Sequence, residues 1–292
     1  MCILICSKAH SGYPFILLSN RDEFFTRPTA PAAFVTPDIL RPTDLARPEH
    51  GTWIGITKSG KISVLVNYRQ YSGSPTGKIS RGLIPLGYLE SETDIDPQIW
   101  GENYREKMDD FKDVGGFSLL FGEIKMKEKG LNSLFVLSNR TDTVVEAFDS
   151  KITRKEGYLA LSNSTIWDPW PKVEIGEELL ANVIESDLNG EYNSKEMFIE
   201  ALFGILNYTD ERLKKGHTSF EKAFKDIPHS IFIPPLHDKG HSSNYGTRTQ
   251  TVILVDNSGS VLYLERNTSE KSTQKIEFQI GKFTDRGAHR RR

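Results

Sequence analysis

Two apolar runs stand at the amino terminus, residues 2–6 (CILIC) and residues 15–18 (FILL), separated by a short segment typical of a turn. Neither run alternates apolar with polar residues, which is typical of strands that are covered on both faces. The second run passes directly into a polar cluster, residues 19–23 (SNRDE). We therefore expect an amino-terminal hairpin in which the end of the second strand lies beside the start of the first.

The position of Cys2 gives it a distinctive chemistry. Removal of Met1 would leave a thiol and a free amine on one Cα, and the amine, with a pKa near ~8, can accept the proton of the thiol. One residue would then supply both nucleophile and base. The alternative interpretation is structural, because free cysteine often serves as a small buried apolar residue.

The polar cluster also has two interpretations. Strands disfavour Asn and Asp, so the strand either ends here in a turn or carries these residues for a function. In the functional interpretation, Arg21 stabilises a thiolate at Cys2, and Asp22 orients the amine or accepts its proton. Neighbours on a regular strand point to opposite faces, so both reach Cys2 only where a bulge or the strand end turns one of them.

The composition excludes several classes of protein. The chain has 292 residues, of which 37% are hydrophobic, and a net charge of −2, which indicates a globular protein and no nucleic-acid partner. The two cysteines, Cys2 and Cys6, stand too far apart on a strand to form a bridge, and their scarcity fits a reducing compartment. No run approaches the ~20 apolar residues of a membrane span, and no secretory signal is visible. We expect a soluble, cytoplasmic protein without a membrane span; its oligomeric state stays open.

Further along the chain the pattern lacks regular βαβ alternation, which argues against a doubly wound parallel sheet. Residues 28–48, rich in proline and threonine, are expected to form a long surface loop. Strands at both ends with helices between them favour two stacked, mainly antiparallel sheets with helical outer layers. Ser-Asn follows an apolar strand at residues 19–20, 138–139 and 162–163, at a spacing too irregular for a structural repeat. We expect one domain over residues 1–280 and a basic carboxy-terminal tail over residues 281–292.

The expected elements follow from apolar periodicity and from turn residues. They are a hairpin over residues 53–67, a helix that starts at Ser80 or Arg81 and runs to residue 89, helices over residues 96–111, 173–188, 194–206 and 220–224, strands over residues 117–121, 134–137, 144–148 and 158–161, and a closing hairpin over residues 249–264.

Several short motifs occur in a fixed order: Met1-Cys2, residues 20–23 (NRDE), 51–55 (GTWIG), 67–69 (NYR), 80–82 (SRG), 161–164 (LSNS) with 171–173 (PKV), and 245–248 (YGTR). Together they resemble the NRDE family, also called the transport and Golgi organisation 2 family. This family is in turn similar to N-terminal-nucleophile (Ntn) cysteine hydrolases such as penicillin V acylases and bile salt hydrolases. The resemblance implies an α+β fold, a four-layer αββα sandwich.

The resemblance also implies a set of site residues. Cys2 matches the nucleophile of the cysteine acylases, and Asp22 their aspartate near the end of the second strand. Asn67 matches the asparagine of their oxyanion hole, Asn163 their second asparagine, and Arg248 their late arginine. Arg21 differs, because in the acylases the arginine stands several positions before the aspartate. The structural alternative for Asn67 and Asn163 is turn capping at strand ends.

Two functions follow from the resemblance. One is hydrolysis of a small or lipidic amide by Cys2. The other is a non-catalytic carrier or trafficking factor that binds a ligand in the same cleft, in Golgi organisation and secretion or in lipid or haem handling, with a possible Golgi or mitochondrial association.

Other candidate sites are weaker. We expect no metal and no cofactor, because paired-cysteine, phosphate-loop and dinucleotide motifs are absent from the sequence. His237 and His241 have a helical metal-binding spacing, but the neighbouring prolines and glycine favour a solvated loop. A set of aromatic residues either lines a pocket or packs in the core: Phe24, Phe25, Trp53, Trp167 and Trp170.

Overall fold

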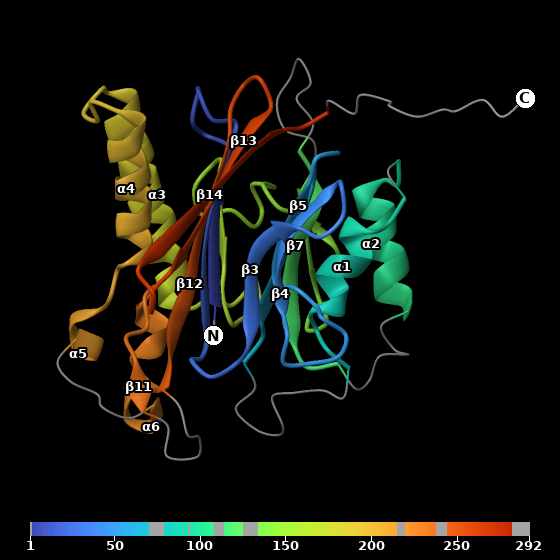
Figure 1. Cartoon of the computed structure of the whole chain (residues 1–292), viewed down its shortest axis with the longest axis horizontal. Helices are drawn as coiled ribbons and strands as arrows, with labels where there is room; N and C mark the ends of the chain where they lie inside the picture. Colours follow the sequence, from blue (N-terminus) through green and yellow to red (C-terminus); the bar gives the residue numbers. More distant parts are fainter. Residues whose placement is uncertain are drawn as a thin grey trace, which may run out of the picture.

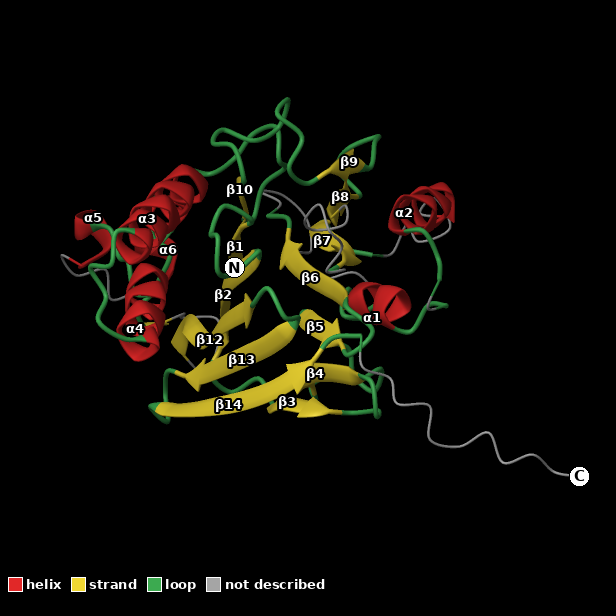
Figure 2. Cartoon of the chain, turned by 90° about the horizontal axis from the view of Figure 1, so that it is seen from above, coloured by secondary structure: helices red, strands yellow, loops and turns green. Residues whose placement is uncertain are grey.

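The computed structural model describes residues 2–69, 79–92, 94–107, 114–124, 134–214, 220–237 and 244–281. Its strands form two antiparallel sheets that lie face to face between two pairs of helices (Figures 1 and 2). The first sheet has the order β10 (Tyr158–Leu161), β1 (Cys2–Ser7), β2 (Phe15–Phe24), β12 (Asn244–Val255), β13 (Ser260–Asn267) and β14 (Ser272–Gln279), with β11 (Leu236–His237) paired to β12. The second has the order β3 (Thr29–Phe34), β4 (Ile39–Asp44), β5 (Ile54–Thr57), β6 (Lys61–Asn67), β7 (Phe117–Glu123), β8 (Leu134–Ser138) and β9 (Val145–Glu146).

The helices begin where the sequence offers caps. Asp96 accepts a hydrogen bond from the Ile99 amide at the start of α2 (Pro97–Glu106), and Ser194 accepts one from the Met197 amide at the start of α4 (Lys195–Leu206). Proline stands at the first position of α2 and of α3 (Pro171–Leu188), where its fixed φ suits a helix. The remaining described helices are α1 (Leu83–Leu89), α5 (Glu211–Lys214), α6 (Phe220–Ala223) and the 3₁₀ turn η2 (Ile227–His229).

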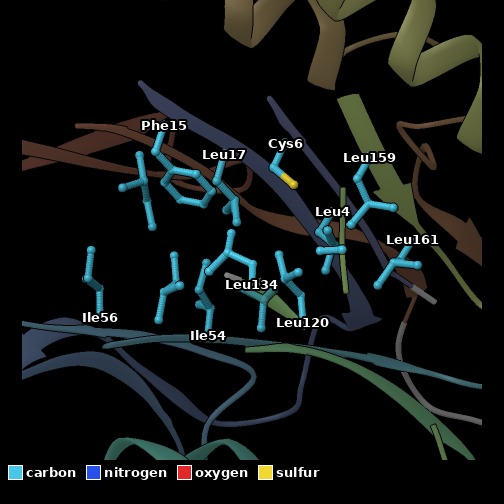
Figure 3. Packing of buried hydrophobic residues seen from close by; sticks show 14 of the residues in the cluster. Leu4, Cys6, Phe15, Leu17, Ile54, Ile56, Leu120, Leu134, Leu159 and Leu161 are labelled. Atoms are coloured by element: carbon cyan, nitrogen blue, oxygen red, sulfur yellow. The ribbon is translucent and has the colours of Figure 1, made fainter. Parts of the chain in front are cut away.

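Alternation along the strands divides the apolar residues among three layers of packing. Figure 3 shows the layer between the sheets, where Leu4 and Leu17 of the first sheet face Ile54 and Leu120 of the second. The opposite face of β1 and β2 packs against α3 and α4. The outer face of the second sheet packs against α1 and α2 through an aromatic cluster that includes Tyr88, Trp100 and Phe121. The chain is therefore an α+β protein, and its layers form the αββα sandwich.

The amino-terminal hairpin was predicted correctly, and β1 and β2 are buried on both faces. The turn interpretation of residues 19–23 is wrong, because β2 continues through them to Phe24. The long loop expected over residues 28–48 is also wrong, because this segment forms β3 and β4. β3 lies at the edge of its sheet, where a strand tolerates proline, and Ala32 is its one buried residue. The segment therefore lacked the apolar signal of a strand.

Several boundaries also differ from the expectation. The strand expected over residues 144–148 is reduced to Val145–Glu146, and α2 ends at Glu106. The edge strand β14 was not predicted, because its residues are exposed or half-buried and mostly polar. Residues 282–292 of the basic tail and His241 lie outside the described residues. Among the residues that are described, no helix combines the length and apolar character that crossing a bilayer requires.

Candidate active site

The ladder between β1 and β2 places Cys2 directly opposite Arg21. Residues opposite each other in an antiparallel pair point to the same face. Cys2 belongs to the packing layer between the sheets, and the Arg21 guanidinium lies over the Trp53 ring, 4.2 Å from its centroid. The Cys2 side chain is buried, with 8% of its surface exposed, and Arg21 has 6% exposed. The first strand pair thus brings the thiol and a cation together on one buried face.

Asn163 holds the main chain of Cys2 and joins it to the second sheet. Its Oδ1 accepts a hydrogen bond of 3.1 Å from the Cys2 nitrogen, and its Nδ2 donates one of 2.7 Å to the Asn67 carbonyl at the end of β6. Ser162 adds a hydrogen bond of 2.8 Å from its Oγ to the Cys2 carbonyl. Three segments that are far apart in the sequence therefore meet at Cys2.

The same arrangement, a Ser-Asn pair that binds the main chain of a neighbouring strand, occurs a second time, in the other sheet. Asn139 accepts a 3.0 Å hydrogen bond from the Phe117 nitrogen, and Ser138 donates one of 2.6 Å to the Phe117 carbonyl. Both Ser-Asn pairs stand at the end of a strand and hold the first residue of a neighbouring strand. The irregular spacing in sequence thus concealed a repeated local structure. Holding a strand end this way is not evidence of catalysis by itself.

Arg21 and Asp22 point to opposite faces of β2, as a regular strand requires. Asp22 is buried on the face toward α3, where its Oδ1 accepts a 2.6 Å hydrogen bond from Thr247 and its carbonyl accepts one of 3.0 Å from the Tyr245 hydroxyl. Burial raises the pKa of the Asp22 carboxyl, and the charge of Lys172 and the hydrogen bond from Thr247 lower it. The irregularity in this region lies in the partner strand β12, between Thr247 and Thr249. Asp22 therefore faces the main-chain side of Cys2, and Arg21 the thiol side.

Two further cations near Cys2 were not among the predicted site residues. Burial lowers the pKa of Arg81, whereas a negative charge on Cys2 raises it, and Arg81 donates a 3.1 Å hydrogen bond to the Gly116 carbonyl. Burial also lowers the pKa of Lys172, and the charges of Asp22 and Cys2 raise it. Both residues stand in motifs that the sequence contains, residues 80–82 and 171–173. A lysine in the first turn of a helix, where a cation opposes the helix dipole, was the available signal for Lys172.

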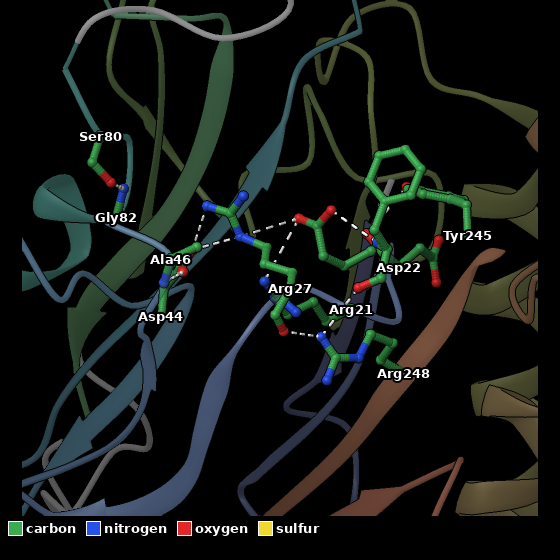
Figure 4. A network of polar contacts seen from close by, with 11 residues as sticks. Arg21, Asp22, Arg27, Asp44, Ala46, Ser80, Gly82, Tyr245 and Arg248 are labelled. Carbon is green, nitrogen blue, oxygen red and sulfur yellow. Dashed lines mark hydrogen bonds and ion pairs between the residues drawn. The ribbon is translucent and has the colours of Figure 1, made fainter. Parts of the chain in front are cut away.

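Arg248 lies farther along the same sheet. Its guanidinium donates hydrogen bonds to the main-chain carbonyls of Phe24, at 3.2 Å, and Arg27 (Figure 4). Arg27 is paired with Asp44 at 2.8 Å in this network. No carboxylate of the described residues lies within 4.0 Å of the Arg248 guanidinium. Burial lowers the pKa of Arg248, and the charge of Arg21 lowers it further, so Arg248 lies within electrostatic reach of the cation opposite Cys2.

A cavity of about 290 Å³ opens beside this arginine. Trp53, Arg248, Thr249 and Asn267 are among its lining residues. Thr249 stands opposite Arg21 in the ladder, so this lining residue lies two strand spacings, roughly 10 Å, from Cys2. Of the five aromatic residues considered above, Trp53 lines the cavity, and Trp167 is exposed.

The described residues contain no group of three or more His, Cys, Asp or Glu side chains with a geometry suited to a metal ion. His237 is exposed at the end of β11. Both cysteines are free thiols, and burial raises the pKa of Cys6.

Comparison with solved structures found a conjugated bile acid hydrolase from Clostridium perfringens, with 11% identity and a TM-score of 0.44, covering 95% of this chain and 92% of that one. An N-acylethanolamine-hydrolyzing acid amidase ortholog from Caenorhabditis elegans has 10% identity and a TM-score of 0.34, covering 87% and 92%.

Relatives in sequence span nearly the whole chain. An uncharacterized protein of Saccharomyces cerevisiae is 31% identical over 91% of each chain. A transport and Golgi organization 2 homolog of Mus musculus is 28% identical over 97% of this chain and 99% of its own. The family model described as transport and Golgi organisation 2 matches residues 1–270. This chain therefore belongs to the transport and Golgi organisation 2 family.

Proposed function

We propose that the chain is a cysteine amide hydrolase of the N-terminal-nucleophile type, acting on a small or lipidic amide with Cys2 as nucleophile. One observation carries this proposal: the buried Cys2 thiol lies on the same face as Arg21, directly opposite it in the ladder, while the Cys2 nitrogen is held 3.1 Å from Asn163 Oδ1. Once Met1 is removed, this nitrogen would be a fixed amine beside the thiol. A nucleophile and a base that are held by a third group are the arrangement that activated nucleophiles require.

The reaction would proceed in two stages. The amine of Cys2 takes the thiol proton, the sulfur bonds to the substrate carbonyl carbon, and the developing oxyanion accepts hydrogen bonds. Collapse breaks the C–N bond, the ammonium of Cys2 returns its proton to the leaving nitrogen, and a thioester remains. Water then attacks the thioester, which gives the carboxylic acid and the free thiol.

Asn67 is the candidate donor to the oxyanion. Its main-chain carbonyl is bound by Asn163, which fixes the strand end, and its side-chain amide makes no hydrogen bond to another described side chain. A single oxyanion donor is worth about 3 to 4 kcal/mol of the reaction barrier. Asn67→Ala is therefore expected to slow acylation roughly 100-fold or more.

The decisive experiment combines intact mass with covalent trapping. Mass spectrometry first establishes the fraction of chains that begin at Cys2. A β-lactone probe is then added to the wild type, to Cys2→Ala and, as the matched control, to Cys6→Ala. Wild type and Cys6→Ala should gain one acyl group on Cys2, and Cys2→Ala should gain none. Equal labelling of Cys2→Ala, or no labelling of chains that lack Met1, would contradict a nucleophilic Cys2.

The cavity favours a second candidate function, a carrier that binds its ligand without hydrolysis. Its volume of about 290 Å³ is at the lower end for small-molecule sites, and Cys2 is not one of its lining residues. The names of the curated relatives refer to transport and Golgi organisation. Titration with an acyl-CoA or haem, followed by intrinsic tryptophan fluorescence, tests this function. Saturable binding that Cys2→Ala retains would support the carrier, and absence of saturation would reject that ligand.

A further inference from the structure

Strands at the border of a sheet present main-chain N–H and C=O groups that can pair with another chain, and proteins usually cover them. At the border strand β3, the Ala32 nitrogen donates to Glu265 at 3.0 Å, and the Ala32 carbonyl accepts from Gln274 at 2.9 Å. At β10, the Ala160 nitrogen donates to Glu177 at 2.8 Å. β9 and β11 have only two residues each. These borders are therefore covered or very short.

β14 is the exception. Its eight residues pair with β13 on one side without a bulge. The nitrogen of Ile280, which follows β14, donates to the Gly259 carbonyl on that side, so the even-numbered residues of β14 turn their main-chain groups toward β13. The odd-numbered residues turn theirs away, and no main-chain hydrogen bond from elsewhere in the described part of the chain reaches them. These residues form the β14 edge: Thr273, Lys275, Glu277 and Gln279.

The side chains of the β14 edge carry two opposite charges. Lys275 and Glu277 lie two residues apart on the same face of the strand, are 59% and 55% exposed, and pair with each other at 3.1 Å. Ile276 stands between them and packs toward the core between the sheets. The sequence Lys275-Ile276-Glu277 is therefore complementary in charge to its own reverse, which is the order that an antiparallel second copy presents.

Hydrogen bonding and charge favour the same register. With Ile276 on a twofold axis, Lys275 of each copy faces Glu277 of the other, and Thr273 faces Gln279. All of these residues turn their main-chain groups outward, so each facing pair can exchange two hydrogen bonds. With Lys275 or Glu277 on the axis, a charge would instead face its own copy, which is destabilising. A shift by one residue would set outward groups against inward ones.

We propose that the β14 edge is an interface between two copies of this chain, which pair antiparallel about a twofold axis at Ile276. The first sheets of the two copies then form one continuous sheet, and the same surface serves on both sides, as in other twofold interfaces. The inference does not depend on the chemistry of Cys2.

The rest of the molecule leaves room for this pairing. α4 packs over β2 and β12, behind β13 and β14. The β12 strands of the two copies would be five strand spacings apart, roughly 24 Å, which is wider than the diameter of a helix. The α4 helices of the two copies therefore do not collide.

Exposed apolar side chains lie beside the β14 edge. Phe34, at the end of β3, is 37% exposed and contacts Phe278 of β14, with the ring centroids 5.4 Å apart. Val35, the next residue, is 43% exposed. Figure 2 shows β3 and β14 along the same border of the molecule. A second copy at this border would cover part of this apolar surface, which adds to the stability of the strand pairing.

Sedimentation equilibrium of the full chain over a range of concentrations tests the interface. Wild type should form a reversible dimer. Lys275→Glu and Glu277→Lys each place like charges opposite one another at both contacts, and each should raise the dissociation constant about tenfold or more. The double variant restores opposite charges and should dimerise like the wild type. Lys214→Glu, an equally exposed lysine of α5 that is also paired with a glutamate, is the matched control and should change nothing.

A mixture of the two single variants is the most specific arm. Lys275→Glu presents two acidic side chains and Glu277→Lys two basic ones, so a mixed dimer has opposite charges at both contacts. The equimolar mixture should therefore associate at concentrations at which each variant alone is monomeric. Both positions are exposed, so the variants should fold, and unchanged melting temperatures verify this.

Hydrogen exchange of single amides, followed by NMR, identifies the strand. The amides of the β14 edge should exchange more slowly as the protein concentration rises, whereas those of Ile276 and Phe278, which face β13, should be protected at every concentration. A wild type that stays monomeric, or a dimer that neither charge reversal weakens, would overturn the inference. Protection of the β14 edge that does not depend on concentration would also overturn it, because the chain itself would then fill the edge.

Discussion

Asn163 and Asn139 provide a matched pair of mutations that separates structure from chemistry. Each side chain makes two hydrogen bonds to main-chain groups: Asn163 to the Cys2 nitrogen and the Asn67 carbonyl, Asn139 to the Phe117 nitrogen and, at 3.3 Å, the Gly115 carbonyl. Substitution by alanine leaves one N–H and one C=O without these partners in each case. An unsatisfied buried polar group costs about 1 to 3 kcal/mol, so Asn163→Ala should lose about 2 to 5 kcal/mol of stability.

Asn139 is less buried than Asn163, so water can replace part of what its substitution removes. We therefore expect Asn139→Ala to lose about 1 to 3 kcal/mol. Urea unfolding followed by tryptophan fluorescence measures both losses, with an unchanged dependence on urea as the check that the denatured states are comparable.

The two variants should differ in the chemistry of Cys2. β-Lactone labelling should fall at least tenfold in Asn163→Ala, because the Cys2 nitrogen is no longer held, and should be unchanged in Asn139→Ala. The reasoning is refuted if Asn163→Ala loses less than about 1 kcal/mol, or if both variants reduce labelling equally. In the first case the hydrogen bonds do not hold Cys2, and in the second the labelling reports stability alone.

Three further predictions follow from particular contacts. Burial raises the pKa of Asp22 above its ordinary value of about 3.9. The stability that this carboxyl contributes is therefore present below about pH 3.9 and is lost as the pH rises toward its folded-state pKa. In urea unfolding, the stability of Asp22→Asn relative to wild type should increase with pH above about 4. Arg248→Met should weaken binding of small carboxylate ligands about 10- to 100-fold by calorimetry, because it removes the arginine from the cavity and leaves Glu265 and Glu270 as the charged lining residues. Gly51→Ala should destabilise by about 1 to 3 kcal/mol in thermal unfolding, because its Cβ would lie 2.7 Å from the main chain of Gly82.

Each of these has a control within the chain. Arg266 pairs with Glu200 on the outside of the sheet, so Arg266→Met should leave carboxylate binding unchanged. A Cβ on Gly87 would meet nothing within 4 Å, so Gly87→Ala in α1 should stabilise slightly. A pH-independent difference for Asp22→Asn, equal losses of binding in both arginine variants, or equal effects of both glycine variants would contradict the respective explanation.

The sequence predicted those strands whose burial shows in the local pattern of apolar residues. The runs at residues 2–6 and 15–18 are apolar at every position because both faces of β1 and β2 are covered, and this made the first hairpin and its ladder predictable. β3 and β14 are edge strands with few buried residues, so their pairing depends on neighbours that a local window does not contain. The order of strands and helices already favoured two stacked sheets with helical outer layers, the family resemblance implied the same sandwich, and the burial of alternate residues confirmed it.

The candidate site was predictable to the extent that its residues lie in one ladder. The expected approach of Arg21 to Cys2 follows from the hairpin alone, and the geometry agrees. The helix-dipole signal noted above marks Lys172 as unusual, but its burial could not be predicted, because a lysine after a proline at a helix start is usually exposed. Its burial arises only when α3 packs against β1 and β10, a contact between segments far apart in the sequence. The burial of Arg81 could not be predicted for the same reason.

The two Ser-Asn pairs differ in the buried positive charges around them. At Phe117 the pair holds an apolar residue, so the device needs neither a thiol nor a cation to fix a strand end. At Cys2 the same device is accompanied by the Arg21 Nη1 and the Lys172 Nζ, two buried nitrogens without hydrogen-bond partners. Such groups reduce stability unless a negative charge forms beside them. Glu23, 3.6 Å from Arg21, and Asp22, whose charge raises the pKa of Lys172, offset part of that cost. The negative charge that the proposed reaction would form at Cys2 would offset more of it.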